Sequence, residues 1–177
     1  MTERPRRYPW APARRPRRCR EQRNPSCRAR LPLRQLGLWT HVVLWSPLIF
    51  PFSFAFVPRI ATAGVSILIA SFVLGIVIGV AEEVLWRGLY LRVFPDNVWA
   101  GAVYPSIAFG IWHLCPLSVL PSRYPGGPLP FLAYSVILGF CYAIVARTSG
   151  SIRWCAVAHA IHDSLGLGAF AYAAWFK

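Results

Sequence analysis

The stretch IATAGVSILIASFVLGIVIGVAEEVLWRGLYLRVFP, residues 60–95, decides the fold. Residues 60–81 are apolar almost throughout, and a membrane-spanning helix needs about 17–25 such residues. The sequence then continues through EEVLWRGLYLRVF without a break until Pro95. We therefore predict one long membrane helix that ends at Pro95 and carries two adjacent acids, Glu82 and Glu83.

Four further apolar stretches surround this helix, and the chain as a whole is 56% hydrophobic with a mean hydropathy of +0.45. Short segments with Pro, Gly, Asn or Arg separate the stretches, as expected for turns between spans. The sequence therefore predicts an all-α, polytopic transmembrane bundle of about five spans. The predicted spans are 38–57, 60–81, 98–115, 130–146 and 154–176, and the predicted breaks are 57–59, 95–97, 116–129 and 147–153.

The formal charge of +13 is concentrated at the N-terminus. Residues 1–34 hold 12 Arg and 2 Glu with several prolines, whereas residues 35–177 carry a net charge of only +3. A segment so poor in aliphatic residues cannot offset the entropy of ordering, so we predict that it is disordered. The chain thus divides into a basic tail, 1–34, and a transmembrane domain, 35–177. We expect membrane lipid, and not nucleic acid, as a partner.

The Lys and Arg residues also indicate the orientation in the membrane. If the tail is cytoplasmic, the tail and the turns on its side carry 16 Lys or Arg residues, and the opposite side carries three. Cytoplasmic loops are enriched in these residues. We therefore expect an integral membrane protein of the cell membrane with its N-terminus in the cytoplasm.

Several ionisable residues fall at a common depth in the predicted spans, where charges are costly and usually paired or functional. Glu82 and His113 lie about 21 and 25 Å from the turn at 95–97, at 1.5 Å per residue. His159 and Asp163 lie about 14 and 20 Å from the second turn on that side. This agreement in depth predicts one buried site.

Helical spacing distinguishes the two glutamates. Glu83 and Arg87 are four residues apart with the acid first, the favourable order for an ion pair on a helix. This pairing would leave Glu82 free to act as a general base. His159 and Asp163 share a helix face, while His162 points about 100° away from Asp163. A role for His162 is left open.

Three segments resemble motifs of the CPBP family, the CAAX-protease and bacteriocin-processing membrane peptidases. The segment EEVLWRG at 82–88 resembles the EExxxR motif of the family, and AFGIWH at 108–113 resembles FxxxH through Phe109 and His113. The segment ending in HAIHD, at 159–163, resembles HxxxN/D through His159 and Asp163. The three motifs occur in the family's order, and the resemblance covers residues 60–175.

The resemblance implies a metal-free intramembrane endopeptidase with a cavity that opens to the cytoplasmic side. Glu82 and His113 would activate a water, and His159 and Asp163 would stabilise the oxyanion. The substrate would be a peptide or protein. It could be lipidated, as in the processing of prenylated proteins, or it could be a peptide that takes part in peptide maturation or self-immunity. Asp163 stands where asparagine is common, and an ionised Asp cannot donate to an oxyanion. It would then be protonated or orient His159.

Two alternatives remain at this point. A zinc-dependent peptidase could use Glu82, Glu83, His113 and His159, because zinc sites combine His and carboxylate ligands. The sequence has no HExxH spacing, and its five cysteines lack CxxC spacing. A non-catalytic membrane immunity or scaffold protein could instead keep the same residues for helix packing. The sequence leaves the substrate and the oligomeric state open.

Overall fold

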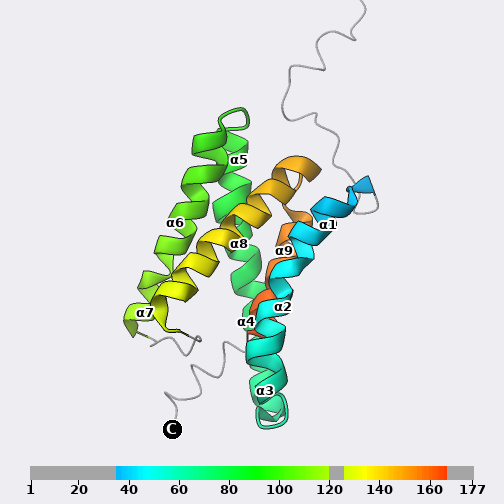
Figure 1. Ribbon diagram of the computed structural model, residues 1–177, viewed down its shortest axis with the longest axis vertical. Helices are drawn as coiled ribbons and strands as arrows, with labels where there is room; N and C mark the ends of the chain where they lie inside the picture. The colour runs from blue at the N-terminus through cyan, green and yellow to red at the C-terminus, as the bar shows by residue number, and fades with distance from the viewer. Residues whose placement is uncertain (1–34, 120–125, 167–177) are drawn as a thin grey trace, which may run out of the picture.

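The computed structural model describes residues 35–119 and 126–166 (Figure 1). Every regular element in these two ranges is a helix. Four continuous helical rods are long and apolar enough to cross a membrane: Leu38–Arg59, Gly64–Val93, Trp99–Val119 and Pro128–Ser149. The predictions for the basic tail, 1–34, and for the end of the last apolar stretch, 167–176, lie outside the described residues.

The first rod is a helix interrupted by tighter and wider turns. Its prolines explain the interruptions, because a proline lacks the N–H that an α-helix needs. The break predicted at 57–59 is wrong, since the helix continues to Arg59. Pro58 cannot donate to the carbonyl of Phe54, and the Arg59 guanidinium donates to that carbonyl instead, at 3.0 Å. The segments are α1 (Leu38–Trp45), the 3-10 turn η5 (Ser46–Leu48), α2 (Ile49–Pro51), the π-helical η6 (Phe52–Phe56) and α3 (Val57–Arg59).

The second rod is the long helix predicted from residues 60–95. It consists of α4 (Gly64–Glu83), the π-helical η7 (Val84–Leu89) and α5 (Tyr90–Val93). The prediction that the apolar stretch continues through the two glutamates is therefore confirmed. The wider turn begins directly after Glu83, and such π-turns are frequent at functional sites.

The remaining described elements complete the bundle. The third rod comprises η8 (Trp99–Val103), α6 (Tyr104–Trp112) and α7 (Leu114–Val119), and it is followed by α8 (Pro128–Ser149) and α9 (Arg153–Leu165). The loop predicted from residue 116 is wrong at its start, because the helix continues to Val119. Pro116 lies in the first turn of α7, where a missing N–H is tolerated.

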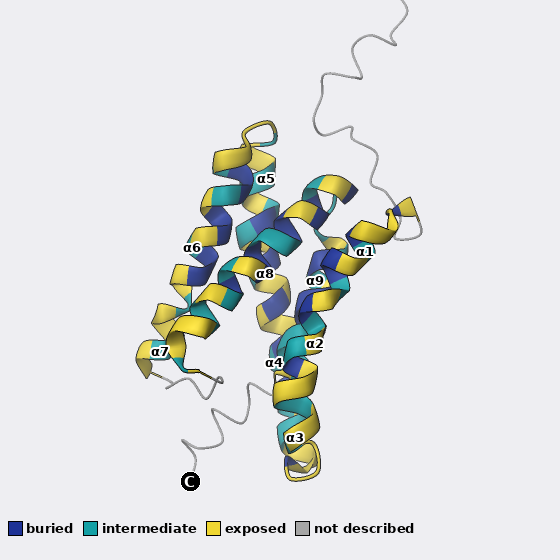
Figure 2. Ribbon diagram, in the orientation of Figure 1, coloured by how far each residue is buried: buried dark blue, intermediate teal, exposed yellow. Residues whose placement is uncertain are grey.

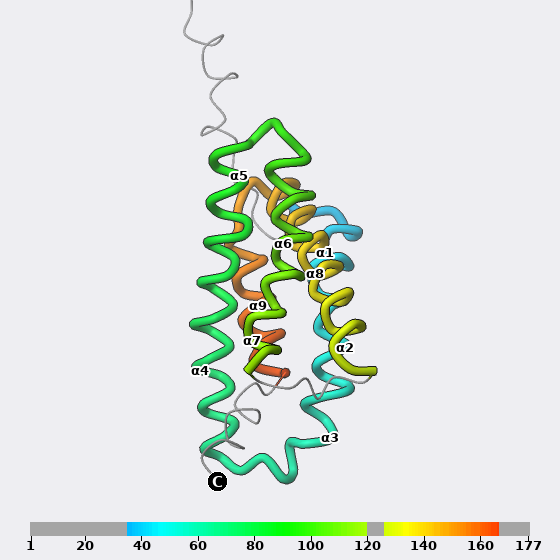
Figure 3. Tube along the Cα trace, turned by 90° about the vertical axis from the view of Figure 1, so that its left-hand side faces the viewer, coloured from blue at the N-terminus to red at the C-terminus, as the bar shows by residue number. Residues whose placement is uncertain are grey.

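The helices alternate in direction as predicted. The start of α1, the turn after α5 and the turn between α8 and α9 lie towards one end of the molecule (Figures 1 and 3). The turn between α3 and α4 and the end of α7 lie at the other end. The two turns expected on the cytoplasmic side are thus at the same end of the bundle as the start of α1.

The bundle is apolar outside and partly polar inside. Large apolar side chains lie on its outer surface, among them Leu38 (81% exposed) and Trp99 (75% exposed). Figure 2 shows that exposed positions run along the outer faces of the helices. The interior holds Glu83, Arg87 and His159, all buried, beside apolar residues such as Phe109. Exposed apolar patches of this extent mark a surface that contacts another apolar phase, here the lipid. This distribution is that of an integral membrane protein.

Helix α9 packs closely along α4 because α4 presents small residues to it. The buried residues of α4 recur every four positions and lead to the site: Ser71, Gly75, Gly79 and Glu83. A Cβ atom on Gly79 would lie 2.8 Å from the Ala160 nitrogen of α9. Small residues spaced by four allow membrane helices to approach each other in this way.

This contact makes Gly79→Ala a test of the packing. The added methyl group must displace the backbone of α9, and overpacking of this kind costs about 1–3 kcal/mol. The gain in helix propensity, about 1 kcal/mol, offsets only part of that cost. We expect a lower midpoint of thermal unfolding in detergent.

Gly88→Ala is the matched control on the same rod. The nearest atom to its added methyl is the flexible end of Ile152, at 3.2 Å. This variant should be as stable as the wild type or more stable. Equal midpoints for the two variants would contradict the close α4–α9 contact.

Candidate active site

A buried ion pair lies at the end of α4. The Glu83 carboxylate forms an ion pair with Arg87, with Oε1 2.8 Å from a guanidinium nitrogen, so the pair expected from their spacing is present. The same oxygen, Oε1, is 2.8 Å from Nδ1 of His159 on α9. A carboxylate accepts hydrogen bonds, so Nδ1 of His159 carries the hydrogen. Oε1 of Glu83 therefore links α4 to α9, and the residue is 0% exposed.

The other imidazole nitrogen of His159 faces two further carboxylates. Its Nε2 lies 3.5 Å from Oε2 of Glu82 and 3.6 Å from Oδ1 of Asp163. Unlike Glu83, these two acids are partly open, with side chains 16% and 25% exposed. The adjacent glutamates thus have different surroundings: Glu83 is sealed in the bundle, and Glu82 is accessible to a water or a substrate.

Phe109 of α6 lies at the centre of the site. Its ring is 4.8 Å from the ring of His113 and 5.7 Å from the ring of His159, with both contacts edge to face. The Arg87 guanidinium lies 4.5 Å from the centre of the same ring, within the range of a cation–π interaction. Phe109 therefore fixes Arg87 and spaces the two histidines.

His113, at the end of α6, has one nitrogen committed to the backbone. Its Nδ1 donates to the Phe109 carbonyl at 2.8 Å. In the neutral ring this leaves a lone pair on Nε2, which can accept a proton. His113 also interacts electrostatically with Asp163, His159 and His162. The structure thus brings Glu82, His159 and Asp163 into contact and places His113 beside them, across Phe109.

Sequence reasoning missed the surroundings of His162. Its Nδ1 is 3.1 Å from Oδ1 of Asp163, and its Nε2 is 2.9 Å from the hydroxyl of Tyr134 on α8. That hydroxyl donates to the Pro47 carbonyl of η5 at 2.7 Å. In a regular helix the N–H of residue 51 would bind the Pro47 carbonyl, but Pro51 has no N–H, and this is visible in the sequence. No sequence pattern, however, places Tyr134 near that carbonyl.

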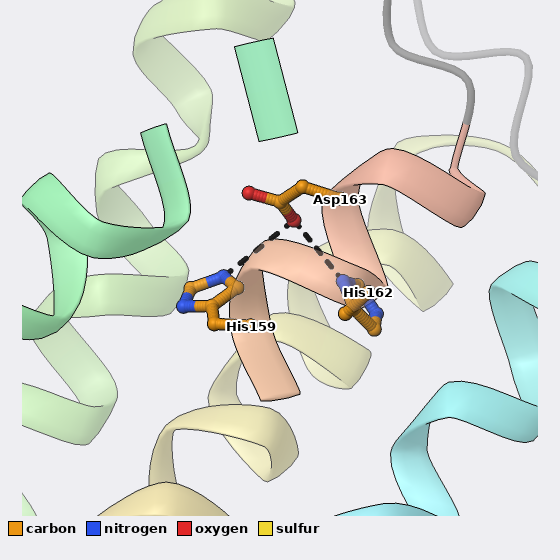
Figure 4. A group of neighbouring side chains, drawn as sticks. All are labelled: His159, His162 and Asp163. Carbon is orange, nitrogen blue, oxygen red and sulfur yellow. Dashed lines mark hydrogen bonds and ion pairs between the residues drawn. The ribbon is translucent and has the colours of Figure 1, made fainter. Parts of the chain in front are cut away.

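Three of these side chains could hold a metal ion. Ligand atoms of His159, His162 and Asp163 all lie within 4.8 Å of one another. Figure 4 shows the Asp163 carboxylate between the two imidazoles, all three carried by α9. This group shares only His159 with the zinc ligands considered from the sequence, which were Glu82, Glu83, His113 and His159.

Removal of Arg87 tests the sealed ion pair. Arg87→Met leaves the Glu83 carboxylate buried with one charged partner fewer, and breaking a buried pair costs about 3–5 kcal/mol. We expect a large fall in the midpoint of thermal unfolding. The double variant Glu83→Gln, Arg87→Met should recover part of the loss.

Arg92→Met is the matched control, because Arg92 is an exposed arginine on the same rod. It should leave the midpoint of unfolding near that of the wild type. An Arg87→Met protein as stable as this control would show that the buried pair does not hold the bundle.

The comparisons with known proteins identify the family. A family model described as type II CAAX prenyl endopeptidase Rce1-like matches residues 63–165, which is more than half of the chain. This range includes all the predicted site residues, from Glu82 to Asp163. No curated protein and no solved structure matches the chain. The match agrees with the resemblance to the CPBP peptidases. The chain belongs to the type II CAAX prenyl endopeptidase Rce1-like family of membrane proteases.

Proposed function

We propose that this protein is an intramembrane endopeptidase that hydrolyses a peptide bond near the cytoplasmic face of the membrane. The observation that carries the proposal is the convergence of Glu82, His159 and Asp163 from α4 and α9, with His113 beside them. Charged groups inside a membrane bundle are costly and are commonly functional. The family supports the reaction class, and this geometry supports the roles given below.

In the proposed reaction Glu82 is the general base. Its carboxylate is partly open, and unlike Glu83 it is not bound to Arg87. A water between Glu82 and Nε2 of His113 loses a proton to Glu82 as its oxygen attacks the substrate carbonyl. Glu82 then gives this proton to the leaving amine, so that Glu82 and His113 return to their starting state. General bases of this kind contribute about 10²–10⁴-fold to the rate.

His159 is the proposed donor to the oxyanion. Its Nδ1–H is bound to Glu83, so its Nε2 can donate only when the ring is the imidazolium. The carboxylates of Glu82, Glu83 and Asp163 surround this ring and stabilise its positive charge. A fixed donor in a site shielded from water stabilises the tetrahedral intermediate. Asp163 then acts as an acceptor that orients His159.

The proposed substrate is a prenylated protein or peptide with a CAAX-type C-terminus, from which the enzyme would release a tripeptide. The family description supports this class. The apolar exterior of the bundle allows a lipid-modified chain to approach from the membrane. We assign no cofactor to this reaction.

Glu82→Gln tests the base. The amide keeps the shape of the side chain and removes its basicity, so we expect cleavage to fall by at least about 100-fold. The measurement uses the full chain in lipid nanodiscs with a farnesylated CAAX peptide, and mass spectrometry quantifies the released tripeptide. The unprenylated peptide is assayed in parallel to test the need for the lipid.

Asp96→Asn is the matched control, because it removes an acid from the turn at 94–98, outside the site. It should cleave at the wild-type rate. Wild-type cleavage by the Glu82→Gln protein would contradict the role of Glu82. Cleavage by no form of the protein would favour the scaffold alternative. Addition of EDTA should not lower the rate, whereas a loss that zinc restores would favour the zinc-dependent alternative.

We also propose that the N-terminus lies in the cytoplasm. The excess of Lys and Arg on the tail side supports this orientation. The test places single cysteines at Val98 and Ala61, two exposed positions near opposite ends of the bundle, in a cysteine-free background. In intact cells a membrane-impermeant maleimide should label Ala61→Cys and spare Val98→Cys. The reverse pattern would overturn the orientation.

A further inference from the structure

We propose that His159, His162 and Asp163 form a binding site for a divalent cation of the zinc class, with the fourth position open to a water. The proposal concerns binding and does not rest on the peptidase activity. Nε2 of His159, Nδ1 of His162 and Oδ1 of Asp163 converge on one point of the site (Figure 4). Three features support it: the spacing of the donor atoms, the direction of the imidazole lone pairs and the local charge.

The spacing of the donor atoms fits a tetrahedral site. Ligand atoms bound to zinc at 2.0–2.2 Å in a tetrahedron are separated from one another by about 3.4 Å. Oδ1 of Asp163 is 3.6 Å from Nε2 of His159 and 3.1 Å from Nδ1 of His162. The ligand atoms of His159 and His162 also lie within 4.8 Å of each other. The gap between Asp163 and His159 is too long for a good hydrogen bond, and both distances from Asp163 are close to the edge length of a zinc coordination sphere.

The remaining imidazole nitrogens are held as they are in metal sites. Metal-bound histidines commonly donate their other N–H to a carboxylate or another acceptor, which fixes the tautomer. Nδ1–H of His159 donates to Glu83 at 2.8 Å. The Tyr134 hydroxyl uses its hydrogen on the Pro47 carbonyl, so it accepts from Nε2–H of His162 at 2.9 Å. In the neutral rings both lone pairs therefore point towards Asp163.

The charge of the cluster also favours a dication. Among the described residues that meet here, Glu82, Glu83 and Asp163 are acids, and Arg87 is the fixed cation. With neutral imidazoles, two negative charges stay uncompensated inside the bundle, where such charges are costly. Three groups face the cluster from α6 and α8 and carry no fixed charge: His113, Tyr134 and Tyr142. One divalent cation would balance the cluster.

The donor set selects the class of cation. Two imidazoles with carboxylates suit zinc and related transition metals, whereas magnesium and calcium prefer oxygen ligands alone. Bound zinc would occupy Nε2 of His159, the atom that the proposed reaction uses as a donor. If that reaction operates, zinc is expected to lower the cleavage rate, and EDTA is expected to restore it.

Direct binding tests the site. The full chain, purified without a histidine tag and placed in nanodiscs, is titrated with zinc chloride by calorimetry and with cobalt by visible absorption. We expect one ion per chain and the intense visible bands of tetrahedral cobalt. His162→Gln removes a ligand and should weaken binding by more than about 10-fold. Tyr134→Phe keeps all three ligands, removes the hydroxyl that bonds His162 and the Pro47 carbonyl, and should weaken binding by about 10–100-fold.

Two histidine variants serve as controls. His41→Gln, on α1 and outside the cluster, should bind zinc as the wild type does. His113→Gln should lose cleavage and retain zinc, because His113 is not among the proposed ligands. Each variant is used only when its unfolding midpoint shows a folded protein. The absence of stoichiometric binding, or wild-type affinity in both His162→Gln and Tyr134→Phe, would overturn the proposal. Neither result depends on whether the protein cleaves a peptide.

Discussion

The Glu83 carboxylate, buried among apolar helices, holds Arg87 on its own rod and His159 on α9. The arrangement of the site depends on this interaction. A carboxylate inside a membrane protein is costly unless its partners are fixed, and both partners here are fixed by further contacts. Arg87 is held over Phe109, and His159 has its tautomer set by the bond from Nδ1. Nε2 of the imidazole is thereby turned towards Glu82 and Asp163.

This interaction requires close approach of two helices, which the small residues of α4 make possible. Between membrane helices there is little hydrophobic driving force, so packing distance and polar contacts determine which helices associate. Gly75 and Gly79 precede Glu83 on one face at intervals of four residues. A larger residue at Gly79 would meet the backbone of α9 and move His159 away from Glu83. The GxxxG spacing and the acid that follows it therefore act as one structural unit.

The sequence predicts those parts of the structure that depend on local pattern. Hydropathy located the long helix through Glu82 and Glu83, and spacing predicted the pair of Glu83 with Arg87. The GxxxG spacing of Gly75 and Gly79 is also a local pattern, and it marks the face of α4 that contacts α9. The helix ends predicted from proline at 57–59 and at 116 were wrong, because the effect of a proline depends on which carbonyl it leaves without a donor. The contacts of Tyr134 depend on the rotation of α8 against two other helices, which no local pattern encodes.

The position of Asp163 explains how a carboxylate can stand where the related peptidases commonly have an amide. Its Oδ1 lies between two imidazoles, at 3.1 Å from His162 and 3.6 Å from His159. As an acceptor, the Asp163 carboxylate can bond either imidazole when that ring carries a hydrogen on the nitrogen facing it. As an anion, it can also bind a cation that lies between the two rings. One oxygen of Asp163 therefore joins the two imidazoles of α9, while Glu83 holds the opposite side of the His159 ring.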